Sequence, residues 1–404
     1  MRRFLTVLAF TLGLAAPALA QELTALARVD AGPSKIEDGY WGRTTLTLHL
    51  SQGVPFRVFL LDDPARLVID FREADWAGVR ATDILAAPGR IAAIRFGAFQ
   101  PGWSRLVADL AEPALPQDIA MPVDPNTGRA ILDITLKTVT QQEFSAQAGT
   151  PKDPSWTRAL VDSAPKSMPG QGRFTVVLDP GHGGVDPGAE SEGVAEKNLM
   201  LSFARSLAED LRRDGIDVIL TRNEDVFIAL ETRVALAHQA GGALFISLHA
   251  DSLAQGSAKG ATVYLLSDEA SDAATEHLAA RHNRSDIIAG ADLTGSDDQV
   301  TSVLLDLARL ETEPRSAALA EALVQEMFAA GGPMNRHPLR RAGFSVLKSA
   351  DIPSVLIELG FVSSKRDLDN LRDPVWRAGM VRAIADAIKR WRDEDAARRP
   401  LVRQ

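Results

Sequence analysis

Hydrophobic and polar positions follow three different patterns along the chain, and an unbroken apolar run comes first. This run, residues 4–16, follows Arg2-Arg3 and precedes the small residues Ala18-Leu19-Ala20. The order predicts a secretory signal peptide over residues 1–20, in preference to a buried N-terminal helix. The run is shorter than the ~20 residues that a membrane span needs, and no later stretch reaches that length. We therefore expect an exported protein without a transmembrane segment.

The next region, residues 21–140, has the period of two that is typical of β-strands. Residues 44–50 alternate between polar and apolar side chains, and so do residues 130–136. One seven-residue pattern occurs twice, at 65–71 and again at 104–110. We interpret the region as an all-β sandwich in which the repeat marks two related sheets. Coincidence between two amphipathic strands is the alternative explanation of the repeat.

Residues 141–172 lose this period and gather Gln, Ser, Pro, Gly and Lys, which predicts a linker. Beyond the linker, short apolar strands alternate with helical segments over residues 173–394, and a tail follows at 395–404. The strands are expected at residues 174–178, 216–220, 243–248, 260–265 and 354–357, with helices at 196–214 and 374–392. This alternation predicts an α/β domain, with a mixed sheet flanked by helices and functional groups at the carboxyl ends of the strands.

Three side chains that can bind a metal lie at the ends of predicted strands. They are His182, His249 and Glu358, and Glu196 begins the helix that follows the glycine-rich loop after the first of these strands. Strand ends in an open α/β sheet converge on one crevice. Two neutral imidazoles and one carboxylate form a ligand set of catalytic zinc, although the helical His-Glu-x-x-His motif of many zinc peptidases is missing.

These residues also have explanations that need no metal. A single histidine at the end of a strand is more often an ordinary core or loop residue. The glycine-rich segment 179–184 could be a simple turn, or a phosphate loop that lacks the usual Lys-Ser/Thr pair. Glu358 is harder to explain in this way, because a carboxylate within an apolar strand is costly unless it is paired or bound. The residues alone leave both interpretations open.

Composition narrows the chemistry further. Apolar residues make up 46% of the 404-residue chain and charged residues 24%, which is typical of a globular protein. The net charge of −9 and the absence of a long basic run argue against nucleic-acid binding. Cysteine is absent, which excludes disulfides, thiolate zinc sites, iron–sulfur clusters and thiol nucleophiles. A metal would therefore be held by histidine and carboxylate side chains.

Several longer motifs resemble a known family. They are Val177-Leu178-Asp179-Pro180-Gly181-His182-Gly183-Gly184, Glu196-Lys197-Asn198-Leu199, Leu220-Thr221-Arg222, Phe245-Ile246-Ser247-Leu248-His249-Ala250-Asp251 and Pro353-Ser354-Val355-Leu356-Ile357-Glu358. Through them, residues 174–392 resemble the zinc-dependent N-acetylmuramoyl-L-alanine amidases of the amidase-3 type. The resemblance implies Zn²⁺ bound by His182, Glu196 and His249, with Glu358 as the catalytic carboxylate. It also implies peptidoglycan as substrate, cut between N-acetylmuramic acid and L-alanine.

The β region resembles a second family, the AMIN domain. The resemblance rests on Val54-Pro55-Phe56-Arg57-Val58-Phe59, Asp63-Pro64-Ala65-Arg66-Leu67-Val68-Ile69-Asp70 and Ile94-Arg95-Phe96-Gly97-Ala98-Phe99. In that family the domain is a non-catalytic module that associates with peptidoglycan or septal structures. Together, the two resemblances imply a periplasmic enzyme of cell-wall remodelling and daughter-cell separation.

A long insert suggests how such an enzyme would be controlled. About ninety residues separate the strands at 260–265 and 354–357, far more than a simple crossover needs. Septal amidases of Gram-negative bacteria carry a similar insert as a helix that blocks the site until a LytM-type activator binds. The resemblance implies this role for residues 273–312. Where relatives often place an inhibitory glutamate, this chain has His282, a candidate inhibitory zinc ligand because imidazole also binds zinc.

Two other functions are compatible with the same motifs. A catalytically inactive peptidoglycan-binding or septal scaffold would need none of the four site residues, so their presence argues against it. Another zinc hydrolase that acts on the same polymer, such as a carboxypeptidase or a deacetylase, would use the same metal chemistry and is distinguished by its products.

Overall fold

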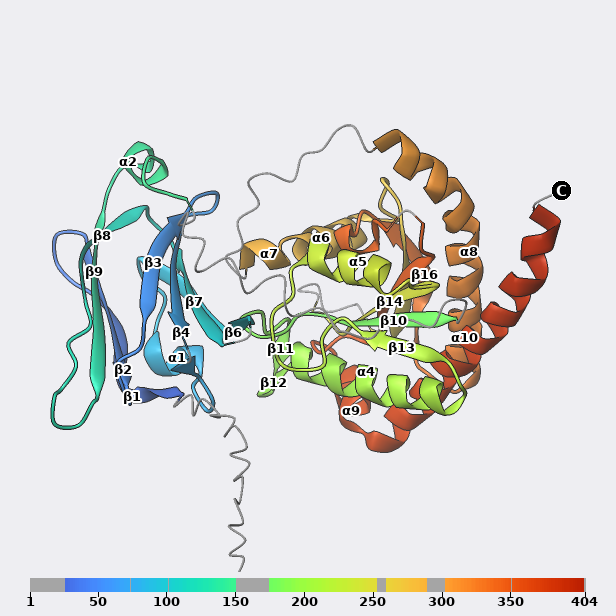
Figure 1. The fold of residues 1–404 in the computed structure, drawn as a ribbon, viewed down its shortest axis with the longest axis horizontal. Helices are drawn as coiled ribbons and strands as arrows, with labels where there is room; N and C mark the ends of the chain where they lie inside the picture. Colours follow the sequence, from blue (N-terminus) through green and yellow to red (C-terminus); the bar gives the residue numbers. More distant parts are fainter. Residues whose placement is uncertain are drawn as a thin grey trace, which may run out of the picture.

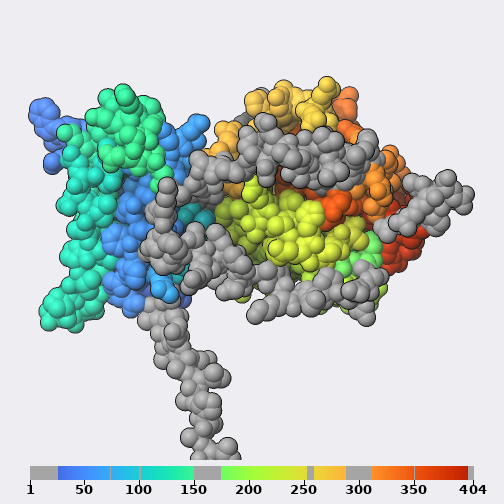
Figure 2. Space-filling view, turned by 45° about the horizontal axis from the view of Figure 1, so that its top comes forward, coloured from blue at the N-terminus to red at the C-terminus, as the bar shows by residue number. Residues whose placement is uncertain are grey.

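A computed structural model of the chain describes residues 26–72, 74–100, 102–149, 174–252, 259–288, 302–349 and 351–402. The predicted signal peptide, most of the predicted linker and part of the predicted insert lie outside these residues. The described residues form a β-sandwich and an α/β domain that pack side by side (Figures 1 and 2). Among them, no helix is both long enough and apolar enough to cross a membrane.

The sandwich consists of two sheets. Its strands are β1 (Ala27–Asp38), β2 (Arg43–Leu50), β3 (Phe56–Leu61), β4 (Arg66–Arg72), β5 (Ala74–Asp75), β6 (Ile91–Gln100), β7 (Trp103–Leu110), β8 (Ala114–Ala120) and β9 (Ala130–Thr138), with the short helix α1 (Ala81–Ile84). One sheet has the order β5-β1-β2-β9-β8 and the other the order β3-β4-β7-β6. Leu48, Leu132, Leu67 and Leu106 come from both sheets and lie in one core with no exposed surface. The alternating pattern therefore predicted the sandwich correctly.

The two copies of the repeated pattern become β4 and β7. These strands pair antiparallel, with Val68 opposite Val107, inside the same four-stranded sheet. The interpretation of the repeat as a mark of two related sheets is therefore wrong. The pattern recurs because both strands turn one side toward the core and the other outward, and neighbouring strands of one sheet share that requirement.

The helix α2 (Gln141–Ser145) follows the sandwich directly. Thr140 caps its first turn by accepting a hydrogen bond from the backbone N–H of Glu143, and Phe144 is fully buried in the sandwich core. Gly149 then forms a bridge with Leu60 of β3. The described start of the predicted linker is thus packed against the sandwich.

The α/β domain is built on a six-stranded sheet. Its strands are β10 (Thr175–Pro180), β13 (Asp217–Leu220), β14 (Leu244–His249), β15 (Ala261–Leu266), β16 (Met334–Ala342) and β17 (Ser354–Glu358), and a small hairpin is formed by β11 (Glu190–Ser191) and β12 (Val194–Ala195). The order is β13-β10-β14-β17-β15-β16. β13, β10, β14 and β17 are parallel, and β15 is antiparallel to β17. The sheet is mixed, as the sequence predicted.

Helices cover both faces of this sheet (Figure 1). They are α4 (Glu196–Arg213), α5 (Leu230–Gln239), α6 (Ala273–Asn283), α7 (Ser285–Ile288), α8 (Ser302–Ala329), α9 (Lys365–Arg372) and α10 (Pro374–Val402), with a 3₁₀ turn η2 (Ser345–Leu347). α4, α8 and α10 pack on one face, where Phe203, Leu323 and Ile388 share a core. α5, α6 and η2 pack on the other face. The predicted fold class, a β-sandwich followed by an α/β domain, is confirmed.

Candidate active site

The sheet brings the predicted site residues to one edge. β10 ends at Pro180, two residues before His182, and β14 and β17 end on His249 and Glu358. Because β14 and β17 are parallel and in register, His249 lies directly opposite Glu358. Glu196 is the first residue of α4, and the backbone N–H of Ala250 donates to its Oε1 at 2.8 Å. All four residues therefore meet at the carboxyl end of the sheet, where ligands bind in open α/β sheets.

Three of them form a compact group of donor atoms. Nε2 of His182 lies 3.2 Å from Oε2 of Glu196, and Nδ1 of His249 lies 3.1 Å from its Oε1. One ligand atom from each residue lies within 4.8 Å of the others. Glu196 has no exposed surface and His249 only 5%. Two imidazoles and a carboxylate at this spacing match the ligand set of a catalytic metal.

The loop that follows β10 orients the His182 ring so that its Nε2 faces the other two residues of the group. Nδ1 of His182 lies 2.8 Å from Oδ2 of Asp186, which fixes the ring and leaves Nε2 buried with no hydrogen-bond partner. His182 itself has a φ of 60°, a strained value for a residue with a Cβ. A Cβ at Gly188 would lie 2.6 Å from the His182 ring and 2.8 Å from Glu196. The site therefore has a buried ring nitrogen that makes no hydrogen bond and a close-packed cradle around it, and both fit a bound metal ion.

Electrostatics supports the same interpretation for two of the three residues. Burial tends to raise the pKa of Glu196, but His182 and His249 outweigh it and hold that pKa well below its ordinary value. Burial, together with the nearby His282, lowers the pKa of His249 to about 4. Glu196 is therefore ionised and His249 neutral near pH 7, which are the protonation states of metal ligands. Burial tends to lower the pKa of His182, but Asp186 and Glu196 outweigh it and hold that pKa well above its ordinary value, so His182 would release a proton when a metal binds.

Glu358 lies beside this group with different surroundings. It has no exposed surface, and its Oε2 accepts the backbone N–H of Asp251 at 2.9 Å. Its other oxygen, Oε1, has no hydrogen-bond partner. Burial is the main cause that raises its pKa to about 7. A carboxyl group with such a pKa can both accept and return a proton near neutral pH, which is what a general base must do.

His282 covers the site from helix α6. It lies on α6, 6% exposed, and its ring centre is 4.2 Å from that of His249. Its Nε2 lies 3.3 Å from Oδ2 of Asp251 and 3.5 Å from Oε1 of Glu358. His282 thus groups with Asp251 and Glu358 rather than with the three predicted ligands. The remaining cavity holds only about 20 Å³, so the site is covered.

Each of the two domains matches a known protein family. The family described as N-acetylmuramoyl-L-alanine amidase matches residues 176–390, and the AMIN domain matches residues 35–140. The chain is 32% identical to N-acetylmuramoyl-L-alanine amidase AmiC of Neisseria meningitidis over 362 residues, which cover 86% of each chain. This chain belongs to the N-acetylmuramoyl-L-alanine amidase family. The family predicted from the sequence motifs is thereby confirmed.

We call the α/β domain the amidase domain from here on. Two further comparisons cover a shorter part of the chain. AmiA of Escherichia coli is 38% identical over 228 residues, covering 56% of this chain and 78% of AmiA. The solved structure of N-acetylmuramoyl-L-alanine amidase AmiC2 of Nostoc punctiforme is 25% identical, with a TM-score of 0.39, and covers 55% of this chain and 99% of AmiC2.

Sequence reasoning missed several residues that support the site of the amidase domain. Asp179, 0% exposed, accepts hydrogen bonds from Thr221 and Ser247 and pairs with Arg233 at 2.7 Å. Arg233 also donates to the carbonyl oxygen of His182 at 2.9 Å. The argument used for Glu358, a carboxylate within an apolar strand, applies equally to Asp179 and could have identified it. Arg233 carries no comparable signal in the sequence.

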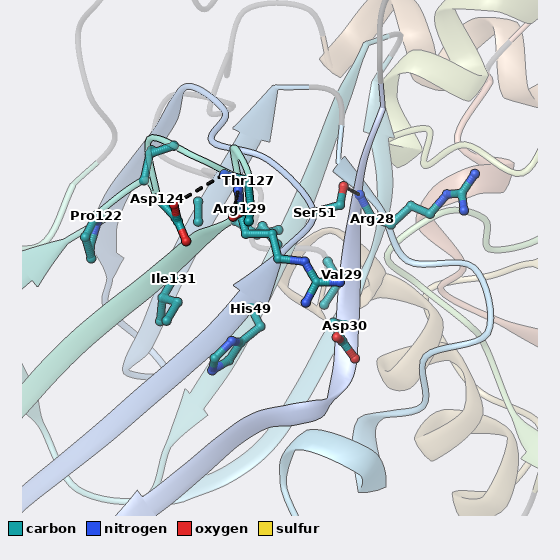
Figure 3. Close-up of a pocket in the computed structure, with 13 residues that line it drawn as sticks. Arg28, Val29, Asp30, His49, Ser51, Pro122, Asp124, Thr127, Arg129 and Ile131 are labelled. Atoms are coloured by element: carbon teal, nitrogen blue, oxygen red, sulfur yellow. Dashed lines mark hydrogen bonds between the residues drawn. The ribbon is translucent and has the colours of Figure 1, made fainter.

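A cavity of about 730 Å³ lies elsewhere, on the sandwich (Figure 3). Arg28, His49, Asp124 and Arg129 are among its lining residues. His49 alternates with the core residues on either side of it in β2, so this cavity lies on the outer surface of the five-stranded sheet. Within the described residues, both groups of possible metal ligands lie in the amidase domain. The chemistry is therefore assigned to the small, covered site.

Proposed function

We propose that this protein is a zinc-dependent enzyme that hydrolyses the amide between N-acetylmuramic acid and L-alanine in peptidoglycan. The observation that carries the proposal is the buried group of His182, Glu196 and His249 beside Glu358 at the carboxyl edge of the sheet. Membership of the amidase family supplies the substrate class. Zinc at these three residues would lower the pKa of water and polarise the scissile carbonyl group.

The side chains of this protein would then transfer the proton and position the reacting groups. Glu358 accepts a proton from the attacking water on its free Oε1 and returns it to the alanine nitrogen as the amide C–N bond breaks. Asp186 holds the His182 ring in one orientation through Nδ1. The backbone N–H of Asp251 keeps Glu358 in place through Oε2. Water, carbonyl group and base would thus be held together before the reaction begins.

Metal content and product identity together test this function. We expect the purified protein to contain one zinc ion per chain and to release peptides with a free N-terminal L-alanine from purified sacculi. His182→Ala should lose both the zinc and the hydrolysis, because it removes the ring nitrogen Nε2 that is proposed to bind zinc beside Glu196. His49→Ala, in the sandwich, is the matched control and should keep both. Stem peptides cut at another bond would indicate another zinc hydrolase, and sacculi left intact by both the wild type and the His282→Ala protein would indicate a scaffold protein.

The proposed cellular setting is the periplasm, during cell-wall remodelling and daughter-cell separation. The sequence of residues 1–20 and the AMIN domain support export and association with the wall. Removal of Arg2 and Arg3 with the signal peptide changes the net charge from −9 to −11, by subtraction of two positive charges. Bulk charge would then not attract the protein to an anionic wall. The AMIN domain and a LytM-type activator are proposed to supply the binding.

We further propose that α6 inhibits the enzyme through His282. His282 faces Glu358 and Asp251 at ion-pair distances, and the neighbouring Arg281 pairs with Asp251. In this position α6 would block the base and the substrate together. An activator that binds the insert, residues 273–312, would withdraw this helix.

His282→Ala should therefore raise basal hydrolysis of sacculi by about tenfold, which corresponds to ~1.4 kcal/mol of lost closing interaction. His277→Ala is the matched control, because His277 is exposed on the same helix. The measurement is the initial rate of dye release from labelled sacculi without activator. An equal rate in the His282→Ala protein and the wild type would contradict inhibition by His282.

A further inference from the structure

The four-stranded sheet of the sandwich has two buried apolar faces. Leu67 and Ile69 of β4 point into the sandwich core. Val68, between them, points the opposite way and is nevertheless 0% exposed. Val68 belongs to a separate cluster on the outer face. This cluster consists of Phe59, Leu61, Val68 and Val107 from the sandwich and Val185 and Phe227 from the amidase domain.

The outer face therefore docks onto the amidase domain. In Figure 1 the sheet that contains β3, β4, β7 and β6 faces that domain, while β2 and β9 lie on the far side. Phe99 of β6 stacks on Phe227 with ring centres 5.7 Å apart and an angle of 10° between the rings. Apolar side chains that are buried only by such docking stabilise it by the hydrophobic effect.

The backbones of the two domains also meet. The N–H of Val185 donates to the carbonyl oxygen of Ala98 at 3.1 Å. A Cβ at Gly184, whose φ is +57°, would lie 1.8 Å from that oxygen, and a Cβ at Gly97 would lie 2.6 Å from the carbonyl oxygen of Gly184. This close backbone contact therefore requires glycine at position 97 in the sandwich and at position 184 in the amidase domain.

The docked loop is the one that carries a predicted metal ligand. Gly183 and Asp186 exchange two backbone hydrogen bonds, of 2.9 and 3.1 Å, which close a tight turn around Gly184 and Val185. Asp186 holds Nδ1 of His182 at 2.8 Å. The sandwich thus contacts the turn that positions His182.

A second contact reaches the helical insert. Arg66 of β4 is only 4% exposed, and its Nη1 donates to the carbonyl oxygen of Ile287 in α7 at 2.6 Å. On its other side, α7 is held by Asp286, which accepts the backbone N–H of Leu230 at 3.0 Å. α7 follows α6, the helix that carries His282. The insert is therefore held in its covering position by both domains.

We propose that the sandwich domain acts as an intramolecular brake on the amidase site. Docked through Arg66 and the Gly97–Phe99 segment, it stabilises α7, and through α7 the preceding helix α6, over the site. This inference rests on the proposed function. Coupling between two sites is reciprocal, so withdrawal of α7 by an activator weakens the docking, and separation of the domains favours withdrawal of α7.

Gly97→Ala in the full chain is the variant that tests the brake. Its Cβ would meet backbone atoms of Gly184 and Val185 at 2.6–3.0 Å, so the domains must move apart to accommodate it. Gly102→Ala is the matched control, because Gly102 lies in the turn between β6 and β7 at a φ of +73° and its Cβ would meet nothing within 4 Å. Both proteins are first checked for native thermal unfolding.

Two measurements are then compared with the wild type. We expect Gly97→Ala to speed hydrogen–deuterium exchange at the Val185 amide and in α7, and to raise basal hydrolysis of sacculi by about fivefold or more. Gly102→Ala should change neither. Phe227→Ala, which removes a cluster residue from the amidase side, should act like Gly97→Ala and serves as the test if Gly97→Ala does not fold.

The possible outcomes separate the two proposals. Unchanged exchange in Gly97→Ala and Phe227→Ala would overturn the docking. Faster exchange with an unchanged basal rate, in a protein that His282→Ala activates, would overturn the brake. If no variant cleaves sacculi, the proposed function fails and the brake fails with it, while the exchange data still report whether the domains dock.

Discussion

Replacement of Glu358 by glutamine should lower kcat on purified sacculi by about 10²–10⁴-fold, the range in which a general base contributes. Glutamine has nearly the same shape, and its carbonyl oxygen can still accept the N–H of Asp251 that holds Oε2. What it cannot do is accept a proton from water. The substitution therefore removes the proposed chemistry and keeps the local packing.

The zinc content of the Glu358→Gln protein shows whether Glu358 acts as a general base or as a fourth zinc ligand. We expect zinc at the wild-type level, because the three proposed ligands are unchanged, and KM close to that of the wild type. Glu209→Gln is the matched control, since Glu209 lies on α4 with a side chain 75% exposed. A Glu358→Gln protein that keeps zinc and cleaves within tenfold of the wild-type rate would contradict the role of Glu358 as base.

The sequence predicted the residues whose positions follow from strand order. His249 and Glu358 end parallel strands of apolar residues, and such ends must lie at one edge of a sheet. Their proximity therefore needed no knowledge of tertiary packing. Glu196 was placed in the same way, as the first residue of a helix that returns along the sheet.

Elements without a hydrophobic pattern were missed for a physical reason. β16 reads Met334-Asn335-Arg336-His337-Pro338-Leu339-Arg340-Arg341-Ala342 and gives neither an apolar run nor a regular alternation. It is an edge strand that pairs only with β15 among the described strands. Edge strands tolerate proline and charge, because one side of the strand needs no partner. Tertiary pairing, rather than local preference, makes this segment a strand.

The contact between the domains was equally invisible in the sequence. Phe59, Val68 and Val107 were compatible with an ordinary amphipathic strand, because an exposed apolar residue on a sheet is common. Only the structure shows Val185 and Phe227 covering them. Long-range contacts of this kind have no period in the sequence. The same holds for Arg233, which lies 54 residues from Asp179 along the chain.

The Asp179–Arg233 pair gives the largest expected effect on stability. Asp179 and Arg233 have side chains only 1% and 4% exposed and lie 2.7 Å apart. Charge from Arg233 and hydrogen bonds from Thr221 and Ser247 outweigh burial and lower the pKa of Asp179. Arg233→Met leaves this buried carboxylate without its cation, which should cost ~3–5 kcal/mol of unfolding free energy. Calorimetry of the full chain should show the amidase domain melting earlier, by about 2–4 °C per kcal/mol.

A double substitution then separates loss of the ion pair from loss of packing. In Asp179→Asn/Arg233→Met no buried charge is left unpaired, so the double variant should be more stable than Arg233→Met alone. Arg213→Met is the matched control, because Arg213 is 62% exposed and pairs at the surface, and it should shift stability by less than about 0.5 kcal/mol. Equal stability of the Arg233→Met and Arg213→Met proteins would mean that the buried ion pair between Arg233 and Asp179 does not stabilise the amidase domain. A double variant no better than Arg233→Met would assign the loss to its contacts with Pro180 and His182 instead of to Asp179.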